Sequence, residues 1–64
     1  MILDVTKIKL ATARLQLTMR EVMKNAHLSS VTVRRVYAGK EVQPRTAGKL
    51  AAALGCDVAE ILKS

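Results

Sequence analysis

The residues best suited to chemistry stand at helical spacing in the middle of the chain. Ser30, Val31, Arg34 and Arg35 occupy positions i, i+1, i+4 and i+5, which share one side of an α-helix. An arginine can donate two parallel hydrogen bonds to guanine, a serine adapts to several bases, and a valine can touch the thymine methyl group. This set suits the major groove of duplex DNA, whereas two adjacent arginines taken alone are also compatible with solvated charges on a helix.

Two short helices must position these side chains. The segment from Thr18 to Glu21 is a capping box, which predicts a second helix that ends near residues 25–27 with Val22, Met23 and Ala26 facing inward. Ser29 is a good N-cap and predicts a third helix over residues 30–37, which Gly39 ends. Three residues, 27–29, separate the two helices, so they must cross steeply as a helix-turn-helix.

The third helix is expected to dock on the core through one side. Val33 and Val36 are the docked residues, helped by Thr32 and Tyr37. The opposite side is then left exposed.

The rest of the chain predicts three more helices. The first covers about residues 4–15, and its inner face carries Val5, Ile8, Ala11 and Leu15. Residues 1–3 form either a frayed end or an apolar arm against a partner chain. The fourth follows Pro44 and carries Ala47, Leu50, Ala51 and Leu54, and the fifth starts at Asp57 with Ile61 and Leu62 inward. We expect one all-α domain of five helices over residues 1–64.

Composition narrows the function. Eleven Lys and Arg against five Asp and Glu give a net charge of +6 in 64 residues, which favours a polyanionic partner. With one Cys and one His, the chain can form neither an internal disulfide nor a structural zinc site. The lack of Phe and Trp argues against binding of single-stranded nucleic acid, which stacks its bases on aromatic side chains. No apolar run approaches the roughly 18 residues of a membrane span. We expect a cytoplasmic protein without enzymatic activity, cofactor, metal, small-molecule effector or membrane partner.

The segment Thr18–Gly39, followed by Lys40, Pro44-Arg45 and residues 50–58, resembles the Xre family, the lambdoid phage repressor and Cro type of helix-turn-helix protein. The resemblance covers about residues 8–62. It implies a compact five-helix, lambda-repressor-like DNA-binding domain with its helix-turn-helix at about 18–38. It further implies a regulator from a phage or another mobile or chromosomal prokaryotic element, located with the nucleoid.

The resemblance also implies roles for individual residues. Ser30, Val31 and Arg35 take base-reading positions, and Arg34 beside them reads a base or a phosphate. Four more residues take positions at the DNA backbone or minor groove: Met19, Ser29, Lys40 and Arg45. Proteins of this family bind pseudo-palindromic operators as symmetric dimers, with half-sites about 34 Å apart.

Five positions depart from the family pattern. Met19 replaces the usual Gln and removes one amide from the DNA backbone contact, and Met23 replaces a small Ala. His27 replaces a Gly in the turn and must tolerate a positive φ. Thr12 and Tyr37 stand where some members have a buried Arg–Glu pair.

Two functions from different classes remain open. The first is a repressor that acts as a homodimer, with the fifth helix and the loop before the fourth as the dimer surface. The alternative is a DNA-binding antitoxin or a protein-interaction subunit of a larger complex, which would need a tail or a large apolar surface. Only residues 1–3 and 61–62 are spare apolar material, and we assign these to a homodimer first. A membrane-surface helix is disfavoured because Gly39, Pro44 and Gly55 break the chain.

Overall fold

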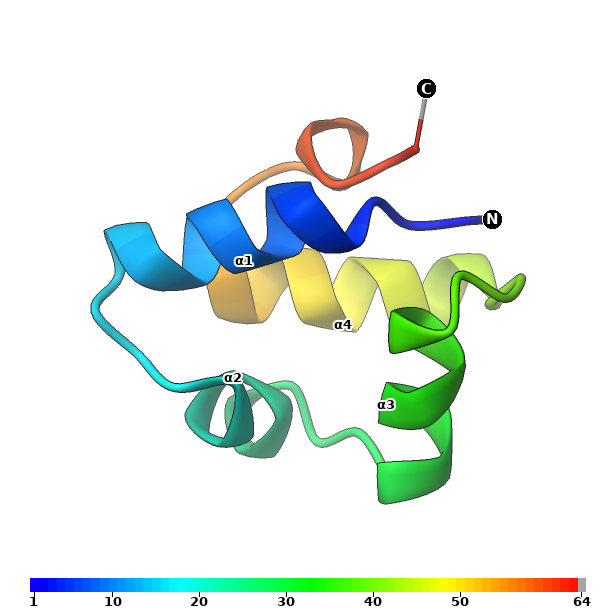
Figure 1. The fold of residues 1–64 in the computed structure, drawn as a ribbon, viewed down its shortest axis with the longest axis horizontal. Helices are drawn as coiled ribbons and strands as arrows, with labels where there is room; N and C mark the ends of the chain where they lie inside the picture. The colour runs from blue at the N-terminus through cyan, green and yellow to red at the C-terminus, as the bar shows by residue number, and fades with distance from the viewer. Residues whose placement is uncertain (64) are drawn as a thin grey trace.

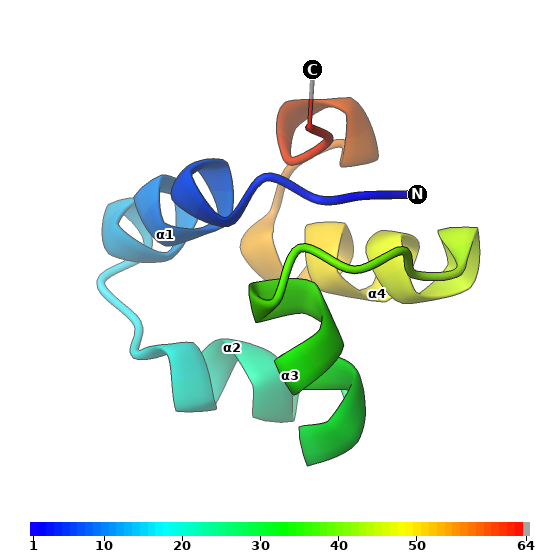
Figure 2. The ribbon, with the colours of Figure 1, turned by 45° about the vertical axis from the view of Figure 1, so that its right-hand side comes forward.

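The structure, a computed structural model, describes residues 1–63. It contains, in order, α1 (Val5–Arg14), α2 (Met19–Asn25), α3 (Ser30–Tyr37), α4 (Pro44–Leu54) and the 3₁₀ turn η1 (Val58–Glu60). α4 is the central helix and contacts α1, α2 and η1. Figures 1 and 2 show α1 beside α4, with α2 and α3 on the side away from η1. The expected all-α fold is confirmed, and none of the helices of residues 1–63 is long and apolar enough to cross a membrane.

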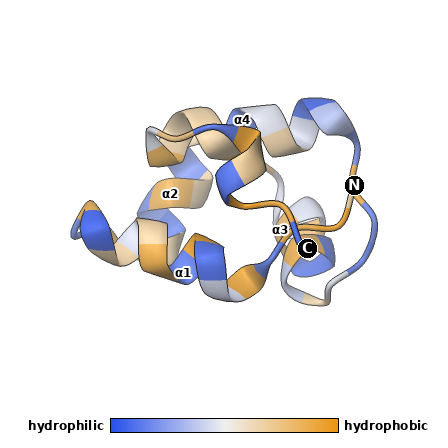
Figure 3. Cartoon of the chain, turned by 90° about the horizontal axis from the view of Figure 1, so that it is seen from above, coloured by the Kyte–Doolittle hydropathy of each residue, from blue (hydrophilic) through white to orange (hydrophobic). Residues whose placement is uncertain are grey.

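Apolar side chains from every α-helix build one core. Figure 3 shows hydrophobic and hydrophilic residues alternating along the helices, as amphipathic helices require. The buried apolar residues are Leu3, Ile8, Val22, Met23, Ala26, Val36, Val42, Ala47, Leu50, Ala51, Leu54 and Ile61. They include the four predicted positions of α4 and the three predicted inward positions of the second helix, of which Ala26 is the C-cap of α2.

The first helix differs from its prediction at its C-terminal end. The Asp4 side chain caps α1 by accepting hydrogen bonds from two backbone N–H groups of the first turn. The buried residues of the inner face are Ile8 and Thr12, and the Thr12 hydroxyl donates to the Ile8 carbonyl at 2.8 Å. Leu15, predicted to face inward, is 39% exposed. The reason is that α1 has ended there and the chain turns at Gln16, whose φ is 57°.

The α-helices all end at left-handed turns. The residues with positive φ that follow them are Gln16, His27, Gly39 and Gly55. After α2, the His27 N–H donates to the Lys24 carbonyl at 3.1 Å and the Leu28 N–H donates to the Met23 carbonyl at 3.2 Å, which is the Schellman pattern. The φ of 57° at His27 confirms that this residue takes the conformation usually left to glycine.

Residues 1–3 are part of the fold. Leu3 is 2% exposed and forms an isolated antiparallel bridge with Leu62. Beside it, the Lys63 N–H donates to the Ile2 carbonyl at 3.0 Å. The expectation of a frayed end or an arm against a partner chain was therefore wrong, because the backbone of this segment finds its partners within the same chain.

The predicted fifth helix is only the 3₁₀ turn η1. Its capping box is confirmed, because the Asp57 N–H donates to the Glu60 carboxylate at 2.9 Å. Ile61 is buried as predicted, and Leu62 is half-buried. The helix does not continue past Ile61, because residues 61–63 pair instead with the N-terminal segment.

Candidate nucleic-acid interface

α3 is attached to the rest of the fold through one side. Val36 is 1% exposed, and Thr32, Val33 and Tyr37 are half-buried, which confirms the predicted docked side. Figures 1 and 2 show that α3 crosses α2 steeply and forms an outer edge of the molecule. The other side of α3 is thereby left to solvent.

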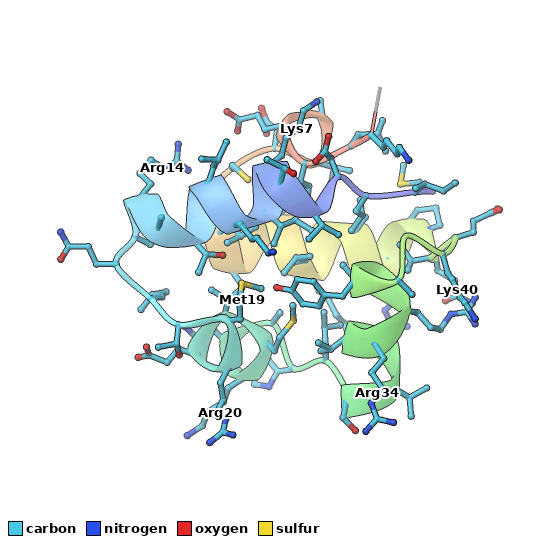
Figure 4. All side chains as sticks on the ribbon, viewed as in Figure 1. Lys7, Arg14, Met19, Arg20, Arg34 and Lys40 are labelled. Carbon is cyan, nitrogen blue, oxygen red and sulfur yellow. The ribbon has the colours of Figure 1, made fainter. Side chains whose placement is uncertain are left out.

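The solvent side of α3 carries the four predicted base-reading residues. Ser30, Val31, Arg34 and Arg35 are all exposed, and we call them the α3 surface. Val31 is 65% exposed, so an apolar side chain is placed in water between cationic neighbours. Figure 4 shows Arg34 extending away from the body of the fold. The structure thus brings these four residues together on one accessible surface.

Ser29 starts α3 as predicted. Its hydroxyl accepts a hydrogen bond from the Thr32 N–H at 3.3 Å and lies 3.0 Å from the Thr32 hydroxyl. Ser29 itself is exposed, at the edge of the α3 surface. The cap therefore fixes the first turn of α3, which carries Ser30 and Val31.

The loop between α3 and α4 adds cations beside the α3 surface. Arg35 reaches this loop, and its Nη2 donates to the Glu41 carbonyl at 3.1 Å. Lys40 is exposed and lines a shallow hollow with Val31, Arg34 and Arg35. Figure 4 shows Lys40 and Arg34 on the same side of the molecule. Arg45 is exposed in the first turn of α4, directly after the loop.

Met19 is placed differently from the other predicted contacts. Its side chain is half-buried, and its sulfur accepts a hydrogen bond from the Thr12 hydroxyl at 3.3 Å. Figure 4 shows it between α1 and α2. The Met19 side chain therefore packs against α1, and part of it lines the groove that Ser30 and Arg34 border.

A groove between α2 and α3 contains cations to which the sequence analysis assigned no role. It is lined by Met19, Arg20, Met23, Lys24, Leu28, Ser30, Val33 and Arg34. Arg20 and Lys24 are exposed and lie one turn apart on α2. Figure 4 shows Arg20 and Arg34 extending from the same side of the molecule. The i, i+4 spacing of Arg20 and Lys24, on the side of α2 opposite the buried Val22, was the sequence signal for this placement.

Most acidic residues lie away from the face formed by α2 and α3, or are engaged in helix caps. Three of the five cap helices on the side of η1 and the chain ends: Asp4, Asp57 and Glu60. A fourth, Glu21, is engaged in the capping box of α2, where hydrogen bonds from the backbone and side chain of Thr18 lower its pKa. Glu41 is the fifth and lies in the loop after α3. The face formed by α2 and α3 is therefore cationic at neutral pH.

A capped α2, a left-handed turn and an outward, cationic α3 define a helix-turn-helix DNA-binding domain. Comparison with known families agrees, because the model of the Cro/C1-type HTH DNA-binding domain matches residues 7–64. The chain belongs to this family, which confirms the resemblance found in the sequence. No curated protein and no solved structure matches the chain.

Proposed function

We propose that this protein is a sequence-specific, double-stranded DNA-binding transcriptional regulator that represses by occupying an operator. The observation that supports this most is the α3 surface, where two arginines, a serine and a valine are exposed together on a Cro/C1-type domain. Inserted with the α3 surface towards the bases, α3 would fit a major groove about 12 Å wide. Transcription would be blocked by occupancy of the site.

The α3 surface supplies the chemistry of base reading. Arg34 and Arg35 can each donate to the O6 and N7 atoms of guanine, and Val31 can contact a thymine methyl group. Ser30 can donate or accept. Because Arg34 also lines the groove towards α2, its alternative partner is a phosphate.

Residues around the α3 surface would hold the DNA backbone. Lys40, Arg45 and Ser29 are exposed and suited to phosphate or minor-groove contact, and Met19 would contribute through its main chain. Arg20 and Lys24 add positive charge on α2. Such contacts make binding weaken as salt rises, with a slope of about −0.9 for each phosphate neutralised.

The operator would be read by a homodimer. α3 has eight residues, so a single copy reads few base pairs. Two copies related by a two-fold axis would place their α3 helices about 34 Å apart, which requires a pseudo-palindromic site. We place the contact between copies at η1 and the loop before α4, and the complex on a prokaryotic nucleoid.

The test is selection of bound sequences from a random duplex pool, followed by titration of the selected duplex and a scrambled one. We expect an enriched palindromic motif and a strong preference for it. A bound pool without an enriched motif would contradict sequence-specific binding. Sedimentation of the complex should give two chains per duplex, and a 1:1 complex on a palindrome would contradict the dimer. A reporter gene behind the motif then distinguishes repression from activation.

A further inference from the structure

Residue 1 pairs with the loop that follows α3. The Val42 N–H donates to the Met1 carbonyl at 2.7 Å, and the Met1 nitrogen donates to the Val42 carbonyl at 2.8 Å. Val42 is 8% exposed, so its side chain anchors the loop in the core while its backbone holds Met1. The N-terminal segment thus ends beside the α3–α4 loop, where Lys40 also lies.

A single peptide group connects this pair to the α3 surface. The N–H of Val42 and the C=O of Glu41 belong to the same peptide unit, which is trans and planar. Its N–H side faces Met1, and its C=O side accepts from Arg35 Nη2 at 3.1 Å. Holding the N–H in place therefore fixes the direction of the carbonyl. A hydrogen bond to the N–H also polarises the group and makes the carbonyl a better acceptor.

We propose that Met1 is a positioning residue for Arg35. Its backbone pair with Val42 sets the 41–42 peptide unit, and this unit orients the Arg35 guanidinium before DNA arrives. A guanidinium has five N–H donors, so one bond to Glu41 leaves donors for the two acceptors of a guanine. The gain is in specificity, because an exposed arginine that is already oriented loses less conformational entropy on binding. This inference rests on the proposed function, since Arg35 must read a base.

The adjacent arginine provides an internal control. Arg34 is exposed on the same side of α3, so it experiences the same net charge and the same DNA. The bond to the Glu41 carbonyl is made by Arg35. A change in the N-terminal segment should therefore act through Arg35 and leave the contribution of Arg34 untouched.

Two N-terminal variants separate backbone from side chain. Both are released from an N-terminal fusion by cleavage directly before the desired first residue. Deletion of Met1 gives a chain that starts at Ile2 and lacks the pair with Val42, while Met1→Ala keeps that pair and loses only the side chain. Both variants retain Leu3 in the core and the Asp4 cap.

Binding to the selected and the scrambled duplex then tests the proposal. Deletion of Met1 should lower the preference for the selected duplex about tenfold, within the range of one misplaced base contact. Met1→Ala should keep the preference for the selected duplex at the level of the parent chain. In an Arg35→Ala background the deletion should have no further effect, whereas in an Arg34→Ala background it should keep its full effect. An equal effect in both backgrounds, or the same loss in Met1→Ala, would overturn the proposal.

NMR of the free protein decides the matter without DNA. In the full chain, the side-chain N–H groups of Arg35 should exchange with water more slowly than those of Arg34, and the difference should vanish on deletion of Met1. A difference that persists refutes the positioning role even if DNA is bound selectively. If the full chain shows no sequence preference, the proposed function fails while this measurement still stands.

A further variant covers the possibility that the deletion unfolds the protein. A synthetic chain with the α-hydroxy analogue at position 42 lacks the same N–H donor but keeps the apolar side chain. Its linkage also makes the Glu41 carbonyl a weaker acceptor, so both bonds of the peptide unit are weakened together. The side-chain N–H groups of Arg35 should then exchange with water as fast as those of Arg34. Slow exchange of the Arg35 groups in this chain would contradict the proposal.

Discussion

Arg14 and Leu54 join the C-terminal ends of two neighbouring helices. The Nη2 of Arg14, the last residue of α1, donates to the carbonyl of Leu54, the last residue of α4, at 3.4 Å. The last carbonyls of a helix lack intrahelical partners and carry partial negative charge. Since α4 has no basic residue in its own last turn, Arg14 supplies the cation from another helix.

The Arg14→Ala variant should therefore lose about 0.5 kcal/mol of unfolding free energy at low salt, the size expected for an exposed charge at a helix end. Urea denaturation at low and high salt measures the effect, which should shrink at high salt because the interaction is screened. Arg14→Lys should retain most of the stability. A loss in Arg14→Ala that is independent of salt would show instead that the side-chain stem matters through packing.

The turn between α2 and α3 offers a stabilising substitution. His27 has a φ of 57°, a conformation that costs a residue with a Cβ about 1 kcal/mol and costs glycine almost nothing. His27→Gly should raise the unfolding free energy by about 0.5 kcal/mol, because the added flexibility of the unfolded chain offsets part of the gain. His27→Ala is the matched control and should give no increase in urea denaturation. Gln16→Gly repeats the test after α1, and losses at both positions would contradict the argument.

Tyr37 has a buried hydroxyl without a hydrogen-bond partner among residues 1–63. An unpaired buried polar group is costly, so Tyr37→Phe should raise the unfolding free energy by about 1 kcal/mol while keeping the ring packed beneath α3. Urea denaturation of the two proteins measures the change. A clear loss of stability in Tyr37→Phe would show that the hydroxyl has a partner in solution.

The same hydroxyl predicts a dependence on alkaline pH. Burial raises the pKa of Tyr37 above its usual 10.0, so the folded state holds this proton more tightly than the unfolded state. The stability from this group is complete below the unfolded pKa and is lost as the pH rises through the folded pKa. Stability measured from neutral pH to pH of about 11 should fall more steeply in the parent than in Tyr37→Phe. Parallel profiles would contradict the raised pKa, because lysine titration is common to both.

Arg35 and Lys40 should show different kinds of loss in DNA binding. Arg35→Ala should cost about 1–3 kcal/mol and relax the preference at one base pair, because a base-edge contact is removed. Lys40→Ala should weaken all duplexes alike and reduce the salt slope by about 1. Gel shifts with every single-base variant of the selected duplex, at two salt concentrations, measure both effects. If the two variants gave the same profile, the division into base and phosphate contacts would be wrong.

Features set by residues three or four positions apart could be predicted from the sequence. The capping box of Thr18 and Glu21 and the Ser29 cap each depend on local hydrogen bonds to the backbone, whereas the left-handed conformation of His27 was implied by the resemblance to the family. The exposed side of α3 follows from them, since docking Val36 on the core turns Arg34 and Arg35 to solvent.

Features set by the packing of distant segments could not be predicted. The sulfur of Met19 lies against Thr12 because α1 and α2 pack there, and no local pattern indicates that contact. The bond from Arg35 to Glu41 requires the loop after α3 to fold back. Similarly, the apolar character of residues 1–3 fits an arm as well as a buried segment, and only the position of Leu62 decides between them.

The bridge between Leu3 and Leu62 also couples the local unfolding of the first and last segments of the fold. The Asp4 N–H donates to the Ile61 carbonyl at 2.8 Å on one side of the bridge, and Lys63 holds Ile2 on the other. Neither segment can peel away without breaking the backbone bonds of the other and uncovering Ile61, which is fully buried. The amide protons of Asp4 and Lys63 should therefore exchange with solvent only when the two segments separate together.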